Sequence, residues 1–288
     1  MGQSLSTPYT TFPERLRASF QASNSMLCVG LDPDRARMPQ GYTASPADIE
    51  RFCVEVVKAT AEYACAFKPQ IAYFAACRAE AALENIIGRI RELAPHATVV
   101  LDAKRGDIGA TAKQYAIEAF ERFNADSVTL SPYMGHDSVE PYHAYPDRGL
   151  FLLCRTSNPG GNDLQFLNTE AGEPLYQTVA KLATGPWNPH QQVGLVVGAT
   201  YPEEIRTVRH LVGDAPLLVP GIGAQGGDLQ NTVKHGLCSE GWGLLINSSR
   251  AILYASSGAD FAQAAAREAQ ATQQAIAQAK AQALNGAQ

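Results

Sequence analysis

Charged side chains of both signs stand close together in Asp102-Ala-Lys104-Arg-Gly-Asp107, which directly follows the apolar run ATVVL. Side chains alternate between the two faces of a strand, so Asp102 and Lys104 are predicted to point the same way. Nearby carboxylates favour the protonated form of a lysine. Such an ammonium group can stabilise negative charge that develops on a substrate carbon and can then donate a proton to it.

Two more charged residues stand at the ends of other apolar runs. Asp32 follows MLCVGL, and Lys68 follows CAF. An Asp-x-Lys pair taken alone most often belongs to a solvated surface strip. Here apolar residues precede it, so the charges are predicted to be buried, and buried charges are costly unless they are paired. A paired network at the end of a buried strand favours a functional site.

A second group of residues is suited to binding phosphate. Pro220-Gly-Ile-Gly-Ala-Gln-Gly-Gly227 follows one apolar run, and Asn247-Ser-Ser-Arg250 follows the next. Glycines allow backbone N–H groups to approach an anion, and an arginine can donate two hydrogen bonds to phosphate oxygens. The alternative is a pair of tight turns beside an arginine without a function.

The elements that must position these residues follow a repeat. Short apolar runs alternate with amphipathic segments, which predicts a parallel sheet with helical crossovers. Eight such units in 288 residues predict a closed (β/α)8 TIM barrel, a single α/β domain over 1–288. An open doubly wound sheet would favour GxGxxG after the first run, where the sequence reads GLDPDRARMPQG. The eight runs are 26–32, 65–69, 97–104, 126–131, 149–154, 193–198, 216–221 and 242–247.

Three segments lie outside this repeat. The sequence predicts a leading helix over about 12–25 and an Ala/Gln-rich helix over about 261–285, which would pack on the surface or at a dimer interface. The Gly- and Asn-rich segment 157–173 follows the fifth run and is long for such a connection. Long loops at this position of a barrel often act as lids.

Composition excludes several classes of function. The net charge of -5 argues against nucleic-acid binding as the main role. Six cysteines lack Cys-x-x-Cys or zinc spacing, which fits core positions in a reducing cytoplasm. The sequence shows neither a signal peptide nor a run of roughly 20 apolar residues, so no membrane span is expected. Gly2 and Ser6 match the bare pattern for N-myristoylation, but no other feature points to a membrane.

The spacing Asp102-x-Lys104-x-x-Asp107-Ile108-x-x-Thr111 resembles the signature of the orotidine 5′-phosphate decarboxylases, most closely their longer bacterial subgroup. The resemblance implies a cofactor-free, metal-free barrel enzyme that converts orotidine 5′-monophosphate to UMP and CO2 in pyrimidine biosynthesis. It also implies a homodimer with shared active sites. Further matching segments follow in the same order, namely GLDPD (30–34), FKP (67–69), RTSNPG (155–160), PGIGAQGG (220–227) and NSSR (247–250).

The resemblance also implies roles for the charged residues. Lys104 would protonate C6 of the pyrimidine, and Asp102 would lie near the substrate carboxylate and keep Lys104 charged. Lys68 and Asp32 would hydrogen-bond each other and the ribose hydroxyls. Asp107 would reach across the dimer interface into the partner's site.

The other residues that the resemblance implicates would contact the substrate. Ile108 and Thr111 would lie beside Asp107 at the shared site. The remaining contacts would come from separate loops: Ser157 to the pyrimidine ring, Pro220 along the base pocket, Gln225 over the phosphate and Arg250 to the phosphate.

Three alternatives remain open at this point. The related 3-keto-L-gulonate 6-phosphate decarboxylases and hexulose-phosphate synthases share the Asp-x-Lys-x-x-Asp spacing but use Mg²⁺, held partly by a glutamate where this chain has Lys68. A cation at that position would repel Mg²⁺, which prefers oxygen ligands. A non-catalytic barrel that senses a phosphorylated ligand is the second alternative. A Schiff-base aldolase is the third, and it would need a neutral Lys104 or Lys68.

Overall fold

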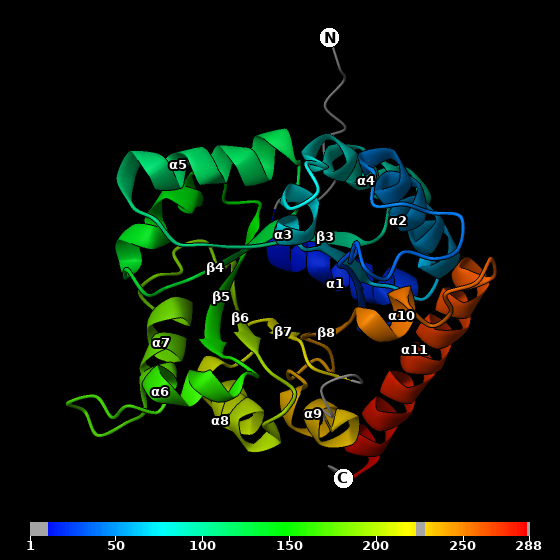
Figure 1. Ribbon diagram of the computed structural model, residues 1–288. Helices are drawn as coiled ribbons and strands as arrows, with labels where there is room; N and C mark the ends of the chain where they lie inside the picture. Colours follow the sequence, from blue (N-terminus) through cyan, green and yellow to red (C-terminus); the bar gives the residue numbers. More distant parts are fainter. Residues whose placement is uncertain (1–10, 223–227, 287–288) are drawn as a thin grey trace.

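Eight parallel strands pair in chain order, and the last pairs with the first, so they form a closed barrel (Figure 1). The structure is a computed structural model that describes residues 11–222 and 228–286. The Gly2–Ser6 pattern and Gln225 lie outside the described residues. The strands are β1 (Leu27–Leu31), β2 (Ala66–Pro69), β3 (Thr98–Arg105), β4 (Ser127–Leu130), β5 (Gly149–Arg155), β6 (Val193–Val197), β7 (Leu217–Val219) and β8 (Leu244–Ser248).

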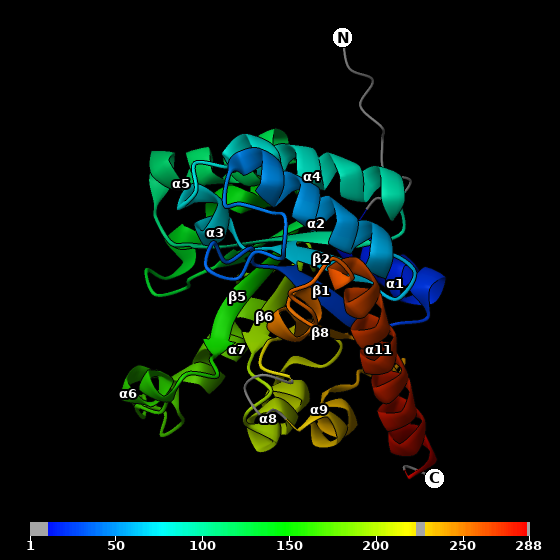
Figure 2. The same cartoon turned by 45° about the vertical axis from the view of Figure 1, so that its right-hand side comes forward.

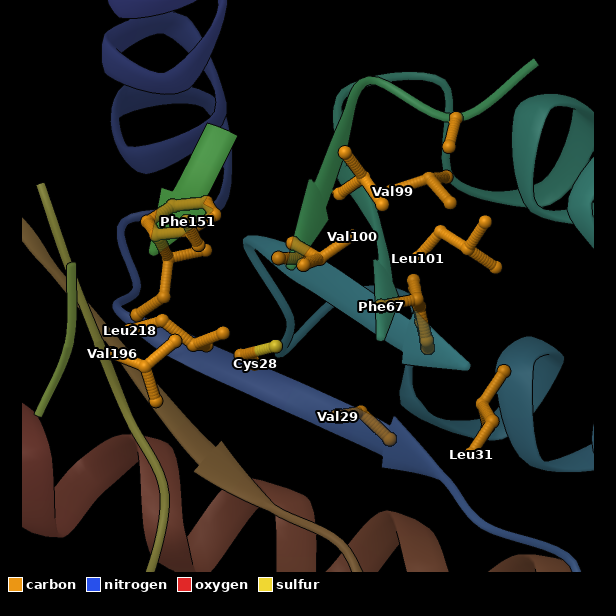
Figure 3. Close-up of a cluster of buried hydrophobic side chains, with 14 of the residues drawn as sticks. Cys28, Val29, Leu31, Phe67, Val99, Val100, Leu101, Phe151, Val196 and Leu218 are labelled. Carbon is orange, nitrogen blue, oxygen red and sulfur yellow. The ribbon is translucent and has the colours of Figure 1, made fainter. Parts of the chain in front are cut away.

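The strands are largely apolar because they pack on both faces. Figure 3 shows side chains of several strands that meet in the core, among them Cys28, Phe67, Val100, Phe151 and Leu218, all nearly or fully buried. Each large apolar side chain buried in this way contributes about 1.5–3 kcal/mol. The predicted (β/α)8 barrel is therefore confirmed, and its eight strands coincide with the eight apolar runs.

Helices form an outer layer around the strands (Figures 1 and 2). Those that begin at a side-chain cap include α2, where Ser45 accepts from the Asp48 N–H, and α9, where Asp228 accepts from the Asn231 N–H. The helices of this layer are α2 (Pro46–Thr60), α3 (Ile71–Ala75), α4 (Glu80–Leu93), α5 (Gly109–Ile117) with the π-helical turn η1 (Glu118–Arg122), α6 (Asn162–Gln165), α7 (Leu175–Thr184), α8 (Pro202–Val212), α9 (Leu229–Gly236), α10 (Arg250–Leu253) and α11 (Phe261–Asn285).

The connection between β4 and β5 departs from the expected alternation. It contains two short 3₁₀ helices, η2 (His136–Ser138) and η3 (Glu140–Ala144), in place of an α-helix. Three prolines and a glycine with φ of +78° interrupt this segment, at Pro132, Gly135, Pro141 and Pro146. Proline lacks the N–H that an α-helix needs and clashes with the preceding turn, so a continuous helix cannot form here.

A leading helix, α1 (Phe12–Ser23), covers the end of the barrel where the strands begin. It starts with a capping box between Thr11 and Glu14. The Phe12 ring is fully buried and packs edge-on against Phe151 at a centroid distance of 5.9 Å. It also fills the space beside Gly149, where an added Cβ would lie only 2.4 Å from the ring.

The long helix α11 packs against α2 and α9 on the outside of the barrel (Figure 2). Its buried positions are mostly alanines, such as Ala265 and Ala269, which allow a close approach to the neighbouring helices. In the part of the chain that the structure describes, no helix combines the length and the apolar character needed to cross a membrane.

Candidate active site

The backbone of β3 leaves regular strand geometry where its charged residues begin. Its pairing with β4 shifts register between Leu101 and Arg105, and Lys104 has a left-handed φ of +47°. A residue with a side chain seldom adopts this conformation, so neighbouring contacts must stabilise it. Thr129 of β4 provides them, because its hydroxyl oxygen accepts from the N–H groups of Ala103 and Lys104 at 3.0 and 2.9 Å.

This irregular backbone brings two lysines onto one carboxylate. Lys68 Nζ donates to Asp102 Oδ2 at 2.8 Å, and Lys104 Nζ donates to Asp102 Oδ1 at 2.6 Å. The Thr129 hydroxyl donates to the same Oδ1 at 2.8 Å. Asp102 and Lys104 therefore meet as their spacing predicts, but through a bulge with a left-handed residue and not through regular alternation.

Burial and charge act in opposite directions on this group. Burial alone would raise the pKa of the Asp102 carboxyl, but attraction to Lys68 and Lys104 outweighs it and holds that pKa well below its usual range. Burial alone would lower the pKa of Lys68, but attraction to Asp102 and Asp32 raises it above its usual value. Lys68 and Asp102 are thus a charged, buried pair. The Lys104 side chain is 45% exposed, so it remains accessible to a ligand.

A cavity of about 180 Å³ opens beside the pair, between the carboxyl ends of β1, β2, β3, β7 and β8. Two of its lining side chains, Asp32 and Asn247, carry a buried Oδ1 atom for which the described residues offer no hydrogen-bond partner. Buried acceptors without a partner are rare in folded proteins, because each lost hydrogen bond is costly. The cavity is therefore suited to a ligand that donates hydrogen bonds, such as one with hydroxyl groups.

The orientation of Asn247 follows from its neighbours. Its Nδ2 donates to Ser249 Oγ at 3.3 Å, which leaves Oδ1 as the unpaired acceptor. Ser249 in turn packs directly over Gly30 of β1, where an added Cβ would lie 1.7 Å from Ser249 Oγ. Only glycine leaves room at position 30 for this arrangement.

Arg250, predicted to bind phosphate, and Pro220, predicted to line the base pocket, both line this cavity. Arg250 is exposed at the first turn of α10 and lines the cavity, as does Pro220 after β7. The Pro220 carbonyl accepts from the Ala199 N–H at 2.8 Å, which ties the loop after β7 to the end of β6. Gln225, expected over the phosphate, lies outside the described residues.

Five of the predicted site residues that the structure describes do not line the cavity within this chain: Lys104, Asp107, Ile108, Thr111 and Ser157. Lys104 is bonded to Asp102, which does line it. Asp107 accepts from the adjacent Ile108 N–H at 2.8 Å, and Ile108 itself is 44% exposed. Thr111 is exposed on the first turn of α5. Ser157 lies over the end of β6, where its backbone would be within 3 Å of a Cβ at Gly198.

One expected contact differs in the structure. Lys68 was expected to hydrogen-bond Asp32, but its ammonium group donates to Asp102 instead. The Oδ1 atom of Asp32 is buried and has no hydrogen-bond partner among the described residues. The reason is geometric, because the bulge of β3 brings the Asp102 carboxylate to within 2.8 Å of Lys68.

The described residues 11–222 and 228–286 hold no group of three or more His, Cys, Asp or Glu side chains arranged to bind a metal ion. The carboxylate that could contribute to such a site, Asp102, is already bonded to two ammonium groups. A cation at Lys68 opposes the binding of a divalent metal ion next to it.

Comparison with known proteins identifies the family. The model of the Orotidine 5′-phosphate decarboxylase / HUMPS family matches residues 25–282. The chain belongs to this family. A relative from Dechloromonas aromatica, named orotidine 5′-phosphate decarboxylase, is 60% identical over 266 residues, which are 92% of this chain and 98% of the relative. The namesake from Ralstonia nicotianae is also 60% identical, over 92% of this chain and 97% of its own length.

A solved structure agrees with this assignment. OMP decarboxylase of Leishmania donovani shares 39% sequence identity with the chain and superposes with a TM-score of 0.81. The comparison covers 94% of this chain and 99% of the Leishmania protein. Membership of the orotidine 5′-phosphate decarboxylase family thus extends over nearly the whole barrel, including every strand that contributes to the cavity.

Two residues of this family member's candidate site were not predicted from its sequence. The sequence marks Thr129 only as a member of the run 126–131, and Asn247 only as a member of the loop 247–250. A signal for Thr129 was present, because Ser127, Thr129 and Ser131 place polar groups at every second position of a buried strand. Such alternation points polar side chains to one face, here toward the bulge of β3.

Proposed function

We propose that this chain converts orotidine 5′-monophosphate to UMP and CO2 with Lys104 as the proton donor, as a step of pyrimidine biosynthesis. The relatives that are 60% identical over almost their full lengths carry the name of this activity. The single observation that carries the mechanism is the position of Lys104, whose Nζ is held 2.6 Å from Asp102 Oδ1 while the side chain stays 45% exposed.

The chemistry explains why such a lysine is needed. Loss of CO2 from C6 of the pyrimidine leaves negative charge on a ring carbon, and an enzyme must lower that barrier by on the order of 20 kcal/mol. A fixed ammonium group stabilises this charge most strongly near the transition state and then donates the proton to C6. Asp102, next to Lys104, would face the substrate carboxylate and disfavour the ground state.

The cavity supports a division of the remaining contacts. The unpaired Oδ1 atoms of Asp32 and Asn247 are suited to accept hydrogen bonds from the ribose hydroxyls, next to Lys68. Arg250 would bind the phosphate, with Gln225 closing over it, and Pro220 and Ser157 would contact the base. Binding of the phosphate, far from C6, would orient the base above Lys104.

A dimer completes the proposed site. Asp107, with Ile108 and Thr111, would enter the partner's cavity, because these residues neither line their own nor, as Lys104 does, bond to the cavity-lining Asp102. Exposed apolar side chains on the loops after β3 and β4 support an interface there, with Ile108 44%, Tyr133 80% and Met134 48% exposed. The six free cysteines fit an enzyme of the reducing cytoplasm.

We further propose that no metal ion takes part. Lys68 occupies the position where the Mg²⁺-dependent relatives carry a glutamate, and its buried amine is paired with Asp102. Turnover of orotidine 5′-monophosphate is expected to persist after dialysis against EDTA. Loss of turnover that Mg²⁺ restores would contradict this proposal. A Schiff-base mechanism through Lys68 is also disfavoured, because the pKa of that amine is raised.

The Lys104→Ala variant tests the proton donor. We expect decarboxylation, followed by the absorbance change of the pyrimidine, to fall by at least about 10³-fold, because the charge and the proton both come from this amine. UMP affinity and the melting temperature should stay near those of the wild type. Lys58→Ala, an exposed lysine of α2, is the matched control. Substantial turnover by Lys104→Ala would remove Lys104 from this role.

A further inference from the structure

Arg155, the last residue of β5, is buried to 1% exposure although it carries a charge. Its guanidinium lies between two aromatic rings, 4.7 Å from the centroid of Phe166 and 4.0 Å from that of Tyr201. Phe166 follows α6 in the segment after β5, and Tyr201 precedes α8 after β6. Burying a guanidinium is costly, so a set of specific contacts must hold it there.

Hydrogen bonds tie the segment after β5 to this guanidinium. Arg155 Nη1 donates to the Thr156 carbonyl at 3.0 Å and to Gln165 Oε1 at 3.2 Å, and Nη2 donates to Asn162 Oδ1 at 2.9 Å. The segment 156–166 therefore wraps around the end of its own strand. Gly161 allows this, because an added Cβ would lie 3.0 Å from Nη1 and 2.9 Å from Gln165 Oε1.

Gln165, which is bonded to Arg155, also holds Thr156, the residue before Ser157. Its Oε1 accepts from the Thr156 N–H at 3.0 Å, and its Nε2 donates to Thr156 Oγ1 at 2.8 Å. Both the backbone and the side chain of Thr156 are thus fixed. Ser157 follows directly and packs on Gly198, whose N–H donates to the Arg155 carbonyl at 2.8 Å.

Arg155 also joins two loops that are separate in sequence. Tyr201 contacts one face of its guanidinium, and Glu204 Oε1 of α8 lies 3.9 Å from its Nε. The loops after β5 and β6 meet at this one side chain. A lysine could supply the charge but not the planar fork that bonds Thr156, Gln165 and Asn162 at once.

We propose that Arg155 is a positioning residue that fixes the segment 156–166 before substrate binds and so holds Ser157 where it meets the pyrimidine. The inference rests on the proposed function, because the contact of Ser157 with the base is part of that proposal. Without Arg155 the segment would have to become ordered when substrate binds, and that cost appears as weaker binding. Arg155 itself does not touch the reacting atoms.

The test is a double-mutant cycle on kcat/KM for orotidine 5′-monophosphate, with Arg155→Met, Ser157→Ala and the double variant. We expect Arg155→Met to raise KM and the Kd for UMP by roughly tenfold or more, and kcat to change less. We also expect Ser157→Ala to have a much smaller effect in the Arg155→Met background than in the wild type. A displaced Ser157 would already have lost its contact with the base, so removing its hydroxyl would change little more.

Arg209→Met is the matched control. Arg209 also fixes a set of loops, by donating to the carbonyls of Gly213, Ala215 and Gly236, but these lie where strands begin, at the opposite end of the barrel. We expect this variant to lower the melting temperature and to leave the effect of Ser157→Ala unchanged. If Arg155→Met does not fold, Arg155→Lys replaces it in the same cycle.

Independent effects of the Arg155 and Ser157 substitutions on kcat/KM would overturn the inference, as would a Ser157→Ala variant with wild-type kinetics. In both cases an active wild-type enzyme would leave the proposed decarboxylase function intact. A wild-type chain that neither turns over orotidine 5′-monophosphate nor binds UMP would overturn the proposed function and this inference together.

Discussion

The hydroxyl group of Thr129 makes three hydrogen bonds that together shape the site. It accepts from the N–H groups of Ala103 and Lys104 and donates to Asp102, so one side chain of β4 stabilises both the left-handed residue and the carboxylate that binds the lysines. A hydroxyl has one donor and two acceptor positions, and this one uses all three. Its contribution therefore exceeds that of an ordinary buried threonine.

Thr129→Val tests this contribution with a side chain of nearly the same shape. The variant leaves two partly buried N–H groups without their acceptor and removes one of the two hydrogen bonds to Asp102 Oδ1, which should cost about 1–3 kcal/mol of the free energy of unfolding. We expect kcat to fall by about tenfold or more, because Lys104 loses the contact that holds its backbone. Unfolding in urea and steady-state kinetics measure the two effects.

Ser127→Ala provides the control from the same strand. Ser127 is also fully buried, but its hydroxyl has no hydrogen-bond partner among the described residues. Its removal should change kcat little. Equal losses of kcat in Thr129→Val and Ser127→Ala would show that the packing of β4 matters and not the bonds of Thr129.

Residue spacing predicted which charged groups meet, but not how. Asp102 and Lys104 come together as expected, while regular alternation gives no hint of the left-handed backbone at Lys104. The expected bond from Lys68 to Asp32 is absent because the irregular backbone of β3 brings Asp102 to Lys68, and residue spacing does not reveal that irregularity. Gln225 remains a prediction, as do the roles of the other site residues.

At the scale of elements, the end of β6 supports the segment that follows β5. Gly198 permits this contact, because an added Cβ would lie 2.7 Å from the Cβ of Ser157 and 2.8 Å from its backbone nitrogen. Backbone atoms cannot move aside as a flexible side chain can. The two loops can therefore approach this closely only if position 198 lacks a side chain.

Gly198→Ala is expected to displace Ser157 and with it the segment 156–166. We expect kcat/KM for orotidine 5′-monophosphate to fall by about 10–100-fold, because small displacements of positioning groups are costly. Gly88→Ala, in the exposed middle of α4 with nothing within 4 Å, is the control. That variant should keep wild-type kinetics and gain up to about 1 kcal/mol of stability. Wild-type kinetics in Gly198→Ala would contradict the supporting contact.

The elements themselves could largely be predicted from the sequence. Buried parallel strands are nearly continuous apolar runs, and the ends of β1 to β8 fall within two residues of those runs. The connection between β4 and β5 is an exception to the alternation of strands and α-helices. Its prolines exclude an α-helix, and the chain forms two 3₁₀ helices there. Apolar periodicity indicates burial, whereas the local helix type depends on individual backbone donors.

At the scale of the whole molecule, barrel closure follows from the number of strand–helix units, whereas assembly does not follow from one chain. The proposed dimer rests on the family resemblance, on exposed apolar residues such as Tyr133, and on the position of Asp107 outside its own cavity. A residue that acts in a partner's site leaves no contact within its own chain, so sequence and single-chain structure can only suggest it.

Mixing two inactive variants tests the shared site. Lys104→Ala and Asp107→Ala should each be nearly inactive alone. In a mixed dimer, however, one site would combine an intact Lys104 with an intact Asp107 from the other chain. Refolding an equal mixture should restore about a quarter of wild-type turnover, because half of the dimers are mixed and each has one intact site. A mixture as inactive as its components would place Asp107 in its own chain's site or outside catalysis.

The position of Phe12, at the end of the barrel where the strands begin, has a consequence for folding during translation. Its ring packs against Gly149 and Phe151, so this contact cannot form until more than half of the chain has left the ribosome. The barrel can close only later still, because β1 must pair with β8, the last strand of the chain. The Phe12 end of α1 therefore stays uncovered until β5 has been made, and a nascent chain that stalls before β5 would expose this apolar side chain to chaperones and proteases.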